Sequence, residues 1–587
     1  MISYKVYLQH LRMNKPLITI QCGNYSNYIG SHFWNLQESG FVYKDNSVGG
    51  GSFGSRAEEL LEIDNDVLYR EGITLDRELT YTPRVIVVDL KGSLGTLPES
   101  GELYDKISIP KEDTLSLHWS GAHQVFREEP FQKNEFLSDL EKGTDNALSE
   151  KEVEEVSSEN EKSEDGSEEK LYNLEESVSC WSDYLGARYH PRSVLLCQSY
   201  QHENPTHPFD AWGLGREVWA DSSGLGETME DRIRHYAEEC DNLGGFQVVS
   251  DCDDGWGGVS SRLVELLSDE YHGKSLLTFP TAAAQHSSWS PAQCGARLAA
   301  SLLSLSHLLA SSSALVTPLS LARDWYPVAG QVTSLCHVTT GQSHYATSSL
   351  LALALDTATA TFRRRHGAGL QVSPGQVSSG LACHGRRVAS LSADVPLQIT
   401  ENVLEYFEQS PLSKVTPLLP GQSSSSARPG QTYTYPALVT CRGLKMSTLY
   451  SRRSPRFKPC PNPSSYLETC INNSSPACRP VCSFFTKPVS TGKPFPHIFN
   501  KTVSSLGEIS EEERRENVGV TFTTALTSWE TGPAAQASLQ CLTSRAGRVN
   551  LGKLHRLAES GVETDEWREA LENLTHHSEL YSDGSDY

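Results

Sequence analysis

The order of hydrophobic and polar positions predicts strands alternating with helices in the first part of the chain. Residues 17–21 (LITIQ) and 84–90 (RVIVVDL) are short apolar runs typical of buried strands. Between them, residues 27–37 place Ile29, Phe33 and Trp34 at helical spacing. Apolar runs of this kind suit a parallel sheet that is covered on both faces. The segment therefore predicts a strand, a tight turn and a helix.

The same succession returns between residues 193 and 279. Strands are predicted at 193–197, 246–249 and 275–279, an amphipathic helix at 227–243, and a second helix from Val259 to Tyr271. A glycine-containing loop separates the strand at 246–249 from the second helix. This alternation predicts an α/β fold with a doubly wound parallel sheet and helices on both faces.

Changes in composition divide the chain into segments. Residues 331–562 are predicted to form a second α+β domain with a helix at 348–362 and a loop-rich part at 411–500. A short C-terminal helix is expected at 563–577, with Trp567, Leu571 and Leu574 on one face. The predicted boundaries are a leader (1–16), two parts of an N-terminal domain (17–126 and 178–330) separated by an acidic insertion (127–177), the second domain (331–562), and a C-terminal helix with an acidic tail (563–587).

Charge changes the interpretation of one segment. The 587 residues carry a net charge of −23, which argues against non-specific nucleic-acid binding because such binding needs a basic surface. From Glu135 to Glu176 there are 16 acidic and 4 basic residues. We expect residues 127–177 to be a disordered spacer, because they offer too little apolar surface to offset chain entropy. The alternative is an acidic segment that attracts basic partners or carries phosphates.

An uncharged stretch at 298–322 is long enough to span a bilayer. It contains several serines, His307 and Pro318, so we expect a core helix at 296–310 followed by a turn or strand; the alternative is a membrane anchor. On this apolar helix, His307 is expected to be a packed, hydrogen-bonded core histidine. The chain has 14 cysteines but no signal-peptide pattern, so reduced thiols are expected. Cys460, Cys470, Cys478 and Cys482 lack the paired spacing of zinc sites, and no metal site is predicted.

The loop between the strand at 246–249 and the following helix carries the candidate chemistry. It lies within residues 251–263 (DCDDGWGGVSSRL) and has the outline of a phosphate loop, in which backbone N–H groups and a helix N-terminus face an anion. Asp253 and Asp254 oppose that use, since two unit charges about 4 Å apart repel by roughly 4 kcal/mol at an effective dielectric near 20. Trp256 is bulky enough to fill the cleft. A magnesium-assisted nucleotide loop and a purely structural turn both remain open.

Three segments together resemble tubulin. They are TIQCGNYSNYIGSHFW (19–34), YTPRVIVVDL (81–90) with Asp89, and CDNLGGFQVVSDCDDGWGGVSSRL (240–263). The chain resembles the Misato family, a divergent group of tubulin relatives, still more closely. The residues that carry this second resemblance are the N-terminal GNYSNYIGSHFWNLQ, WSDYLGARYHPRSV (181–194), AEECDNLGGFQ, HLLASSSALVTPLSL (307–321) and ALDTATATFR.

The tubulin resemblance implies a vestigial guanine-nucleotide site. Its candidate residues are Gly23, Asn24, Tyr25, Asp254, Gly255, Gly257, Gly258 and Ser306. In this alignment Asn24 and Tyr25 replace a nucleotide-touching Gln-Cys pair, Ser306 replaces the asparagine that reads guanine, and Leu302 replaces a stacking tyrosine. No match to the family's catalytic acidic loop follows residue 321, and Asp324 is the nearest acid. We therefore expect at most weak GTP or GDP binding and no catalysis, with a weak GTPase as the alternative.

The Misato resemblance implies a cellular role. It implies a non-enzymatic protein of mitochondrial distribution, morphology and fusion, with a link to spindle assembly and chromosome segregation. Such a protein would be cytoplasmic and peripherally associated with the mitochondrial outer membrane. Its implied partners are tubulin or tubulin chaperones and mitochondrial surface proteins, with no nucleic acid.

Overall fold

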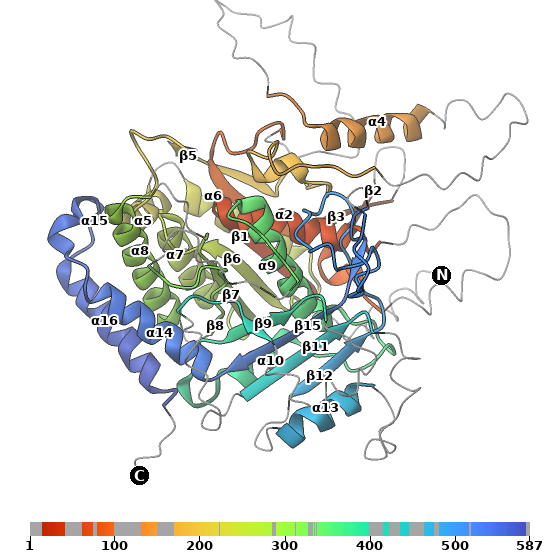
Figure 1. Ribbon diagram of the computed structural model, residues 1–587. Coiled ribbons are helices and arrows are strands. Elements are labelled where there is room, and N and C mark those ends of the chain that lie inside the picture. Colours follow the sequence, from red (N-terminus) through yellow and green to blue (C-terminus); the bar gives the residue numbers. More distant parts are fainter. Residues whose placement is uncertain are drawn as a thin grey trace, which may run out of the picture.

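A parallel six-stranded sheet forms the centre of the computed structural model (Figure 1). Its strands, in spatial order, are β5 (Val194–Gln201), β4 (Val85–Lys91), β1 (Leu17–Cys22), β6 (Gly245–Asp251), β7 (Ser275–Thr281) and β8 (Ala314–Val316). The structure describes residues 15–41, 62–73, 79–98, 131–149, 170–221, 224–284, 289–311, 313–326, 333, 335, 337–397, 415–421, 435–444, 463–474, 480–515 and 518–582. The predicted α/β class with a doubly wound parallel sheet is confirmed.

Each face of this sheet belongs to a different hydrophobic cluster. Ile18 and Ile20 of β1 pack in one cluster, and Leu17 packs in the cluster on the opposite face. The first cluster includes residues of α5 (Trp212–Ala220), α6 (Leu225–Glu238), α7 (Trp256–Glu270) and α8 (Pro291–Ala310), among other helices. The cluster on the opposite face includes residues of α2 (Asn24–Glu38) and α9 (His344–Thr359), among other helices. This double coverage explains why the strands are continuous apolar runs.

A second sheet has five strands, and α9 lies between it and the first sheet (Figure 1). Its spatial order is β10 (Thr416–Pro417), β9 (Ser390–Asp394), β15 (Ala525–Thr531), β11 (Tyr435–Arg442) and β12 (Val481–Phe485). Trp529 of β15 is buried 5.6 Å from the ring of Phe279 in β7 and donates a 3.0 Å hydrogen bond from Nε1 to Thr317. The two sheets therefore share one core.

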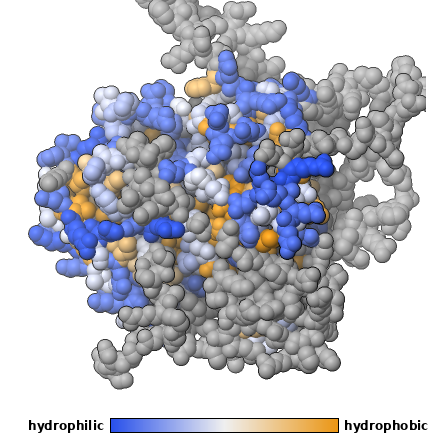
Figure 2. Space-filling model, in the orientation of Figure 1, coloured by the Kyte–Doolittle hydropathy of each residue, from blue (hydrophilic) through white to orange (hydrophobic). Residues whose placement is uncertain are grey.

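Smaller elements complete the described part of the chain. The strands β2 (Tyr69–Ile73) and β3 (Leu79–Pro83) form one hairpin, and β13 (Val489–Ser490) pairs with β14 (Phe522–Thr523). The remaining helices are α4 (Glu135–Ser149), α10 (Pro374–Leu381), α13 (Pro463–Ser474), α14 (Pro533–Ala546), α15 (His555–Glu559) and α16 (Thr564–Glu579). Of these, α16 packs on α14 and α8. Figure 2 shows hydrophilic residues over much of the described surface on this face, with smaller hydrophobic patches between them.

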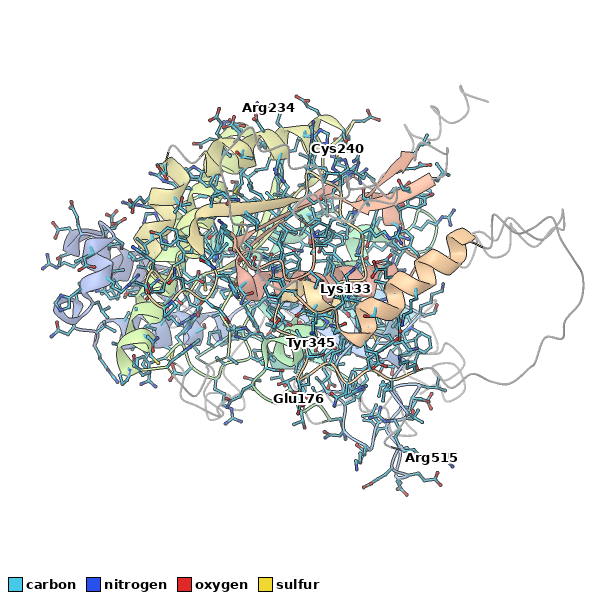
Figure 3. The ribbon with its side chains drawn as sticks, turned by 90° about the horizontal axis from the view of Figure 1, so that it is seen from above. Lys133, Glu176, Arg234, Cys240, Tyr345 and Arg515 are labelled. Carbon is cyan, nitrogen blue, oxygen red and sulfur yellow. The ribbon has the colours of Figure 1, made fainter. Side chains whose placement is uncertain are left out.

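Two expectations for irregular segments need correction. The predicted disordered insertion at 127–177 contains α4, because Phe136 is buried against the main core and Leu137 packs beside it. Seen from above, α4 lies at the periphery, next to Lys133 (Figure 3). The 411–500 segment, predicted to be rich in loops, contributes β11 and β12 to the second sheet. Large parts of both segments, and residues 1–14, lie outside the described residues.

The uncharged stretch at 298–322 contains most of a helix and the short strand that follows it. Its helix, α8, begins at Pro291, earlier than predicted, and is followed by β8. Across the described ranges, the structure contains no helix that combines the length and the apolar character needed to cross a bilayer.

Candidate functional site

The predicted nucleotide loops meet at the carboxyl ends of β1 and β6. Chain order runs from β1 outward to β4 and β5, and then returns to β6 on the other side of β1. The neighbouring strands β1 and β6 thus flank a topological switch point, the place where open α/β sheets bind ligands. Gly23 follows β1 and begins the turn into α2, and residues 252–255 follow β6 and lead into α7. The N-termini of both helices face this crevice.

The N-terminus of α2 is bound by a carboxylate of the chain itself. Asp251, the last residue of β6, accepts hydrogen bonds from the backbone N–H groups of Tyr25 (2.9 Å) and Ser26 (2.8 Å). Its Oδ1 also accepts a 2.7 Å hydrogen bond from Thr281 Oγ1 on β7. Helix N-termini attract anions because their first N–H groups have no partner within the helix. Asp251 therefore occupies the position that suits a phosphate.

The space beside Asp251 is filled by an indole. Trp256, the first residue of α7, is only 2% exposed, and its ring lies 5.2 Å from that of Phe209. Gly23 has φ +107°, and a Cβ at this position would lie 2.5 Å from Asp251 Oδ2 and 2.8 Å from Trp256 Cδ1. Glycine is therefore required here both for its backbone conformation and for the close approach of these two side chains.

The other two aspartates of the loop are also engaged. Asp253 accepts a 2.7 Å hydrogen bond from Arg297 on α8 and forms an ion pair with it. Asp254 Oδ1 accepts a 2.8 Å hydrogen bond from the backbone N–H of Trp256, at the start of α7. Burial and repulsion by Asp253 raise the pKa of Asp251 to about 7. Burial and the carboxylates of Asp251 and Asp253 also raise the pKa of Asp254.

The predicted loop glycines serve helix packing. A Cβ on Gly257 would overlap Ser304 Oγ of α8, and a Cβ on Gly258 would overlap the carbonyl oxygen of Trp212 in α5. Gly255 lies against the ring of Phe209 and donates its N–H to the carbonyl of that residue at 3.2 Å. The glycines that the sequence places near a phosphate therefore allow α7 to approach its neighbouring helices.

The remaining predicted residues on α2 lie in the same place. Asn24 is half-buried at the first turn of this helix. Tyr25 is 3% exposed, and its hydroxyl donates a 3.1 Å hydrogen bond to Thr347 Oγ1 on α9. Tyr25 thus connects the loop after β1 to α9, the helix between the two sheets.

Ser306 is not brought into the crevice with the other candidates. Its hydroxyl accepts a 3.0 Å hydrogen bond from the side chain of Asn573 on α16. The α8 residue that reaches the loop is Ser304, which donates a 2.8 Å hydrogen bond to the carbonyl of Cys252. The expectation that Ser306 occupies a base-reading position is therefore wrong, because successive helical residues point in different directions.

The expectation for His307 also needs correction. Its side chain is 39% exposed, its ring lies 4.6 Å from that of Trp212, and its Nε2 is 3.5 Å from Glu566 on α16. It lines a surface cavity of about 440 Å³ between α5, α7 and α8 and is not a core residue. Asp324, the acid nearest to the missing catalytic loop, forms an ion pair with Arg545 on α14.

Two of the four cysteines grouped in the sequence lie in the core beside the second sheet. Cys470 and Cys482 are buried in the hydrophobic cluster that includes residues of α13, β11 and β12. Cys460 and Cys478 lie outside the described residues. Among the residues that the structure does describe, no three His, Cys, Asp or Glu side chains are grouped as metal ligands.

The assembled geometry does not fit a bound nucleoside triphosphate. Asp251 uses the first N–H groups of α2, Asp254 uses an N–H at the start of α7, and Trp256 fills the space between the loops. A phosphate placed here would meet three carboxylates in a setting of low dielectric. Four residues that close the site were not predicted from the sequence: Asp251, Thr281, Arg297 and Thr347. Of these, only Asp251 had a recognisable signal in the sequence, because it is an acidic residue at the end of a buried strand.

The fold and the position of the crevice define a tubulin-like α/β protein. Two family models match the chain: the Misato Segment II tubulin-like domain over residues 15–142 and the tubulin domain over residues 172–364. The chain is 30% identical to Protein misato homolog 1 of Danio rerio, with 96% of each chain covered. It is 30% identical to Protein misato of Drosophila melanogaster, covering 97% of this chain and 99% of the relative. The chain belongs to the Misato family.

Proposed function

We propose that this chain is a non-enzymatic tubulin-like protein that acts by binding other proteins. The observation that supports this most directly is the pair of hydrogen bonds from the N-terminus of α2 to Asp251. They use the groups with which a tubulin-type site would hold phosphate. Trp256 adds volume at the same place, and Asp253 and Asp254 add acidic side chains that already have partners within the chain. The fold thus keeps the tubulin-like framework, with its crevice taken up by protein side chains.

Family membership supports a cellular role for this framework. We infer a role in mitochondrial distribution, morphology and fusion, together with spindle assembly and chromosome segregation. In this role the chain is cytoplasmic and associates peripherally with the mitochondrial outer membrane. Its partners are tubulin or tubulin chaperones and mitochondrial surface proteins. Carbonate extraction of mitochondria tests the mode of attachment: release of the chain with peripheral proteins is expected, and retention with integral proteins would contradict the proposal.

Nucleotide content tests the proposed absence of enzymatic activity. The full chain is purified in the presence of magnesium, denatured, and its supernatant separated by ion-exchange chromatography. We expect far less than one guanine nucleotide per chain and no phosphate release from added GTP. Stoichiometric GTP or GDP would overturn the proposal. Purified tubulin handled in parallel shows that the procedure retains a bound nucleotide.

A second candidate, a GTP-binding protein or weak GTPase of the tubulin superfamily, is favoured by one observation. The loops after β1 and β6 still meet at the switch point, with both helix N-termini facing the crevice. In this alternative a magnesium ion offsets the carboxylates, and Asp254→Ala changes the magnesium dependence of GTP binding. If wild type and Asp254→Ala both fail to bind labelled GTP at any magnesium concentration, the alternative is rejected.

A further inference from the structure

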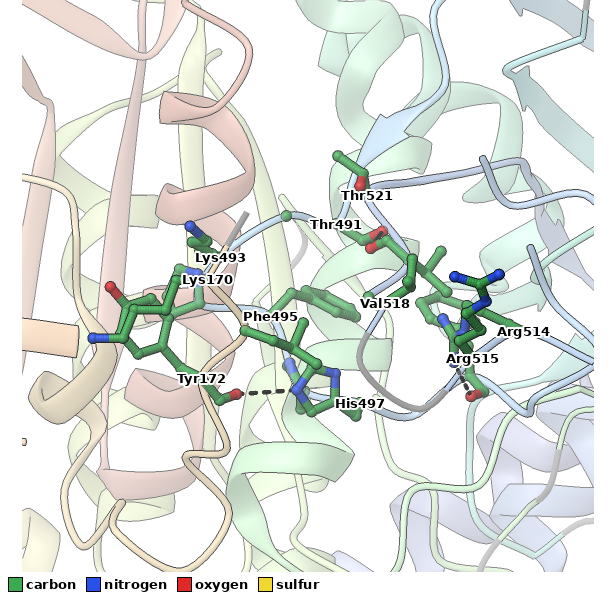
Figure 4. Close-up of a pocket in the computed structure, with 17 residues that line it drawn as sticks. Lys170, Tyr172, Thr491, Lys493, Phe495, His497, Arg514, Arg515, Val518 and Thr521 are labelled. Carbon is green, nitrogen blue, oxygen red and sulfur yellow. Dashed lines mark hydrogen bonds between the residues drawn. The ribbon is translucent and has the colours of Figure 1, made fainter. Parts of the chain in front are cut away.

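A second cavity is formed by three segments that are separate in the sequence and contain none of the residues of the crevice. It has a volume of about 690 Å³ and is lined by residues 170–172, 491–497, 499, 514–515 and 518–521 (Figure 4). The first segment lies near the end of the predicted acidic insertion (127–177), and the other two lie between β13 and β14 in the sequence. A cavity of this size accommodates a small molecule or a few side chains of a partner protein.

Among the described residues, the charged side chains that line this cavity are cationic, although the chain as a whole is acidic. Lys170, Lys493, Arg514 and Arg515 line it, and none of its described lining residues is an aspartate or glutamate. Lys170 and Lys493 lie 5.1 and 5.7 Å from the centroid of the Tyr172 ring. Lys170 is also paired with Glu135 and Asp139 of α4, at 2.6 and 2.5 Å. Lys493 and Arg515 are exposed, so they are the cations best placed to receive an incoming anion.

Arg514 adds a partly desolvated cation. Its Nη2 donates a 3.2 Å hydrogen bond to the carbonyl of Phe499, and burial lowers the pKa of its guanidinium. A carboxylate that approached this group would be attracted more strongly than at a fully solvated arginine, because the local dielectric is lower. Arg515, next to it in sequence, projects at the outer edge of the molecule (Figure 3).

Apolar side chains lie between and around these cations. The rings of Phe495 and Phe499 stack with their centroids 6.1 Å apart, and Figure 4 shows Phe495 between the Lys170–Lys493 side and the Arg514–Arg515 side. Leu171 and Val518 line the cavity although they are 37% and 41% exposed. Phe522, which is 37% exposed, directly follows the lining residue Thr521 in the chain. Gathered exposed apolar side chains mark protein-binding surfaces.

We propose that this cavity, termed the basic cavity, binds an acidic peptide segment of a partner protein, with one large apolar side chain between acidic residues. The apolar residue packs against Phe495 and Val518, and the flanking carboxylates reach Lys493 on one side and Arg515 on the other. A membrane surface fits less well, since the site is concave. This inference rests on the proposed role as a protein-binding scaffold and names the chemistry of one partner.

The test is a peptide selection on the full-length chain. A phage-displayed library of random 12-residue peptides is selected against wild type, with counter-selection on the double variant Lys493→Glu with Arg515→Glu. Both residues are exposed, so the variant is expected to fold, and its circular dichroism and unfolding midpoint verify this. Arg568→Glu on α16 is the matched control, because it reverses an exposed charge on another element. Vesicles of phosphatidylcholine with phosphatidylserine are tested on the same three proteins.

We expect enriched peptides with an aromatic or leucine residue between glutamates or aspartates. Their affinity should fall at least tenfold for the double variant, stay unchanged for Arg568→Glu, and weaken with added salt. Enrichment of neutral or basic peptides, or no enrichment, would overturn the proposal. Charge-dependent vesicle binding without peptide enrichment would assign the site to lipid and overturn it as well. None of these failures would alter the nucleotide measurement, so the two proposals fail separately.

Discussion

The carboxylate of Asp251 lies 2.9 Å from the backbone nitrogen of Tyr25, a residue 226 positions earlier in the chain. This contact joins the end of β6 to the start of α2 across the switch point. In a nucleotide-binding sheet, the helix N-terminus at this place would be left for the ligand. Here the N-terminus of α2 is hydrogen-bonded to Asp251 of the same chain. The contact therefore stabilises the fold and also takes up the groups that would bind a ligand.

Asp251→Ala is predicted to destabilise the chain by about 2 kcal/mol, because two buried N–H groups lose their acceptor. Relief of the repulsion among Asp251, Asp253 and Asp254 offsets part of this cost. Urea unfolding at pH 7 measures the change. Thr281→Val is the matched control, since it removes one donor to the same carboxylate and should cost about 1 kcal/mol. If both variants unfold like wild type, the capping of α2 by Asp251 is not a stabilising contact.

The location of this site could be predicted from the sequence, but the side chains that fill it could not. A buried strand followed by a glycine loop and a helix indicates a crevice between neighbouring strands, and both loops lie where this pattern places them. Which side chain fills the crevice depends on contacts between distant parts of the chain, such as Asp251 with Tyr25. The position of Ser306 was mispredicted for the same reason. Ser306 contacts Asn573 of α16, whereas the helix that contacts the start of α2 is α9, through the hydrogen bond between Thr347 and Tyr25. Neither contact can be inferred from the sequence.

The strands and helices of the first sheet were predictable for a related reason. Their apolar runs and helical periods are local signals, and the observed elements extend several of them by a few residues, as in α2 and β6. The helix α4 was missed because its acidic residues dominate the composition, whereas its docking depends on Phe136 and Leu137. The average composition of a segment does not reveal that one or two of its apolar side chains are buried against the core.

Gly258→Ala is predicted to destabilise the chain by about 2 kcal/mol or more. The added Cβ would overlap the carbonyl oxygen of Trp212, a backbone atom that moves only with α5. Gly295→Ala on α8 is the matched control: its Cβ would lie 3.6 Å from the nearest atom, so the higher helix propensity of alanine should leave stability unchanged or slightly raised. Thermal unfolding of both variants checks this. Equal midpoints would show that α7 does not need close packing at Gly258.

A buried ionic cluster joins α9 to the second sheet and leads to a third prediction. Asp356 on α9 forms ion pairs with Arg363 at 2.6 Å and with Arg442 of β11 at 2.5 Å, and all three side chains are at least 91% buried. Asp356→Ala leaves two buried guanidinium groups without their carboxylate, which is expected to cost about 3–5 kcal/mol. Denaturant unfolding measures the loss. Asp565→Ala, which breaks an exposed pair with Arg568, serves as control and should change little. Similar effects of the two substitutions would contradict the assigned role of the cluster.

The last prediction concerns pH and rests on Glu530 of β15. Its side chain is buried, and its hydrogen-bond partners among the described residues are the hydroxyls of Ser528 and Ser392, at 3.2 and 3.4 Å. Burial raises the pKa of Glu530 to about 7 from the usual 4.5. The folded state therefore holds a proton that the unfolded state releases, and the contribution of this group to stability falls as pH rises from about 4.5 to about 7.

Glu530→Gln removes this titration while keeping the size of the side chain. The stability of the variant relative to wild type should therefore increase between pH 5 and pH 8, by an amount on the order of 3 kcal/mol at most. Urea unfolding of both proteins across this range measures the difference, and the comparison cancels the contribution of other groups with raised pKa values, such as Asp251. Parallel stability curves would mean that Glu530 is already ionised at low pH in the folded chain, with a cation or water compensating its burial.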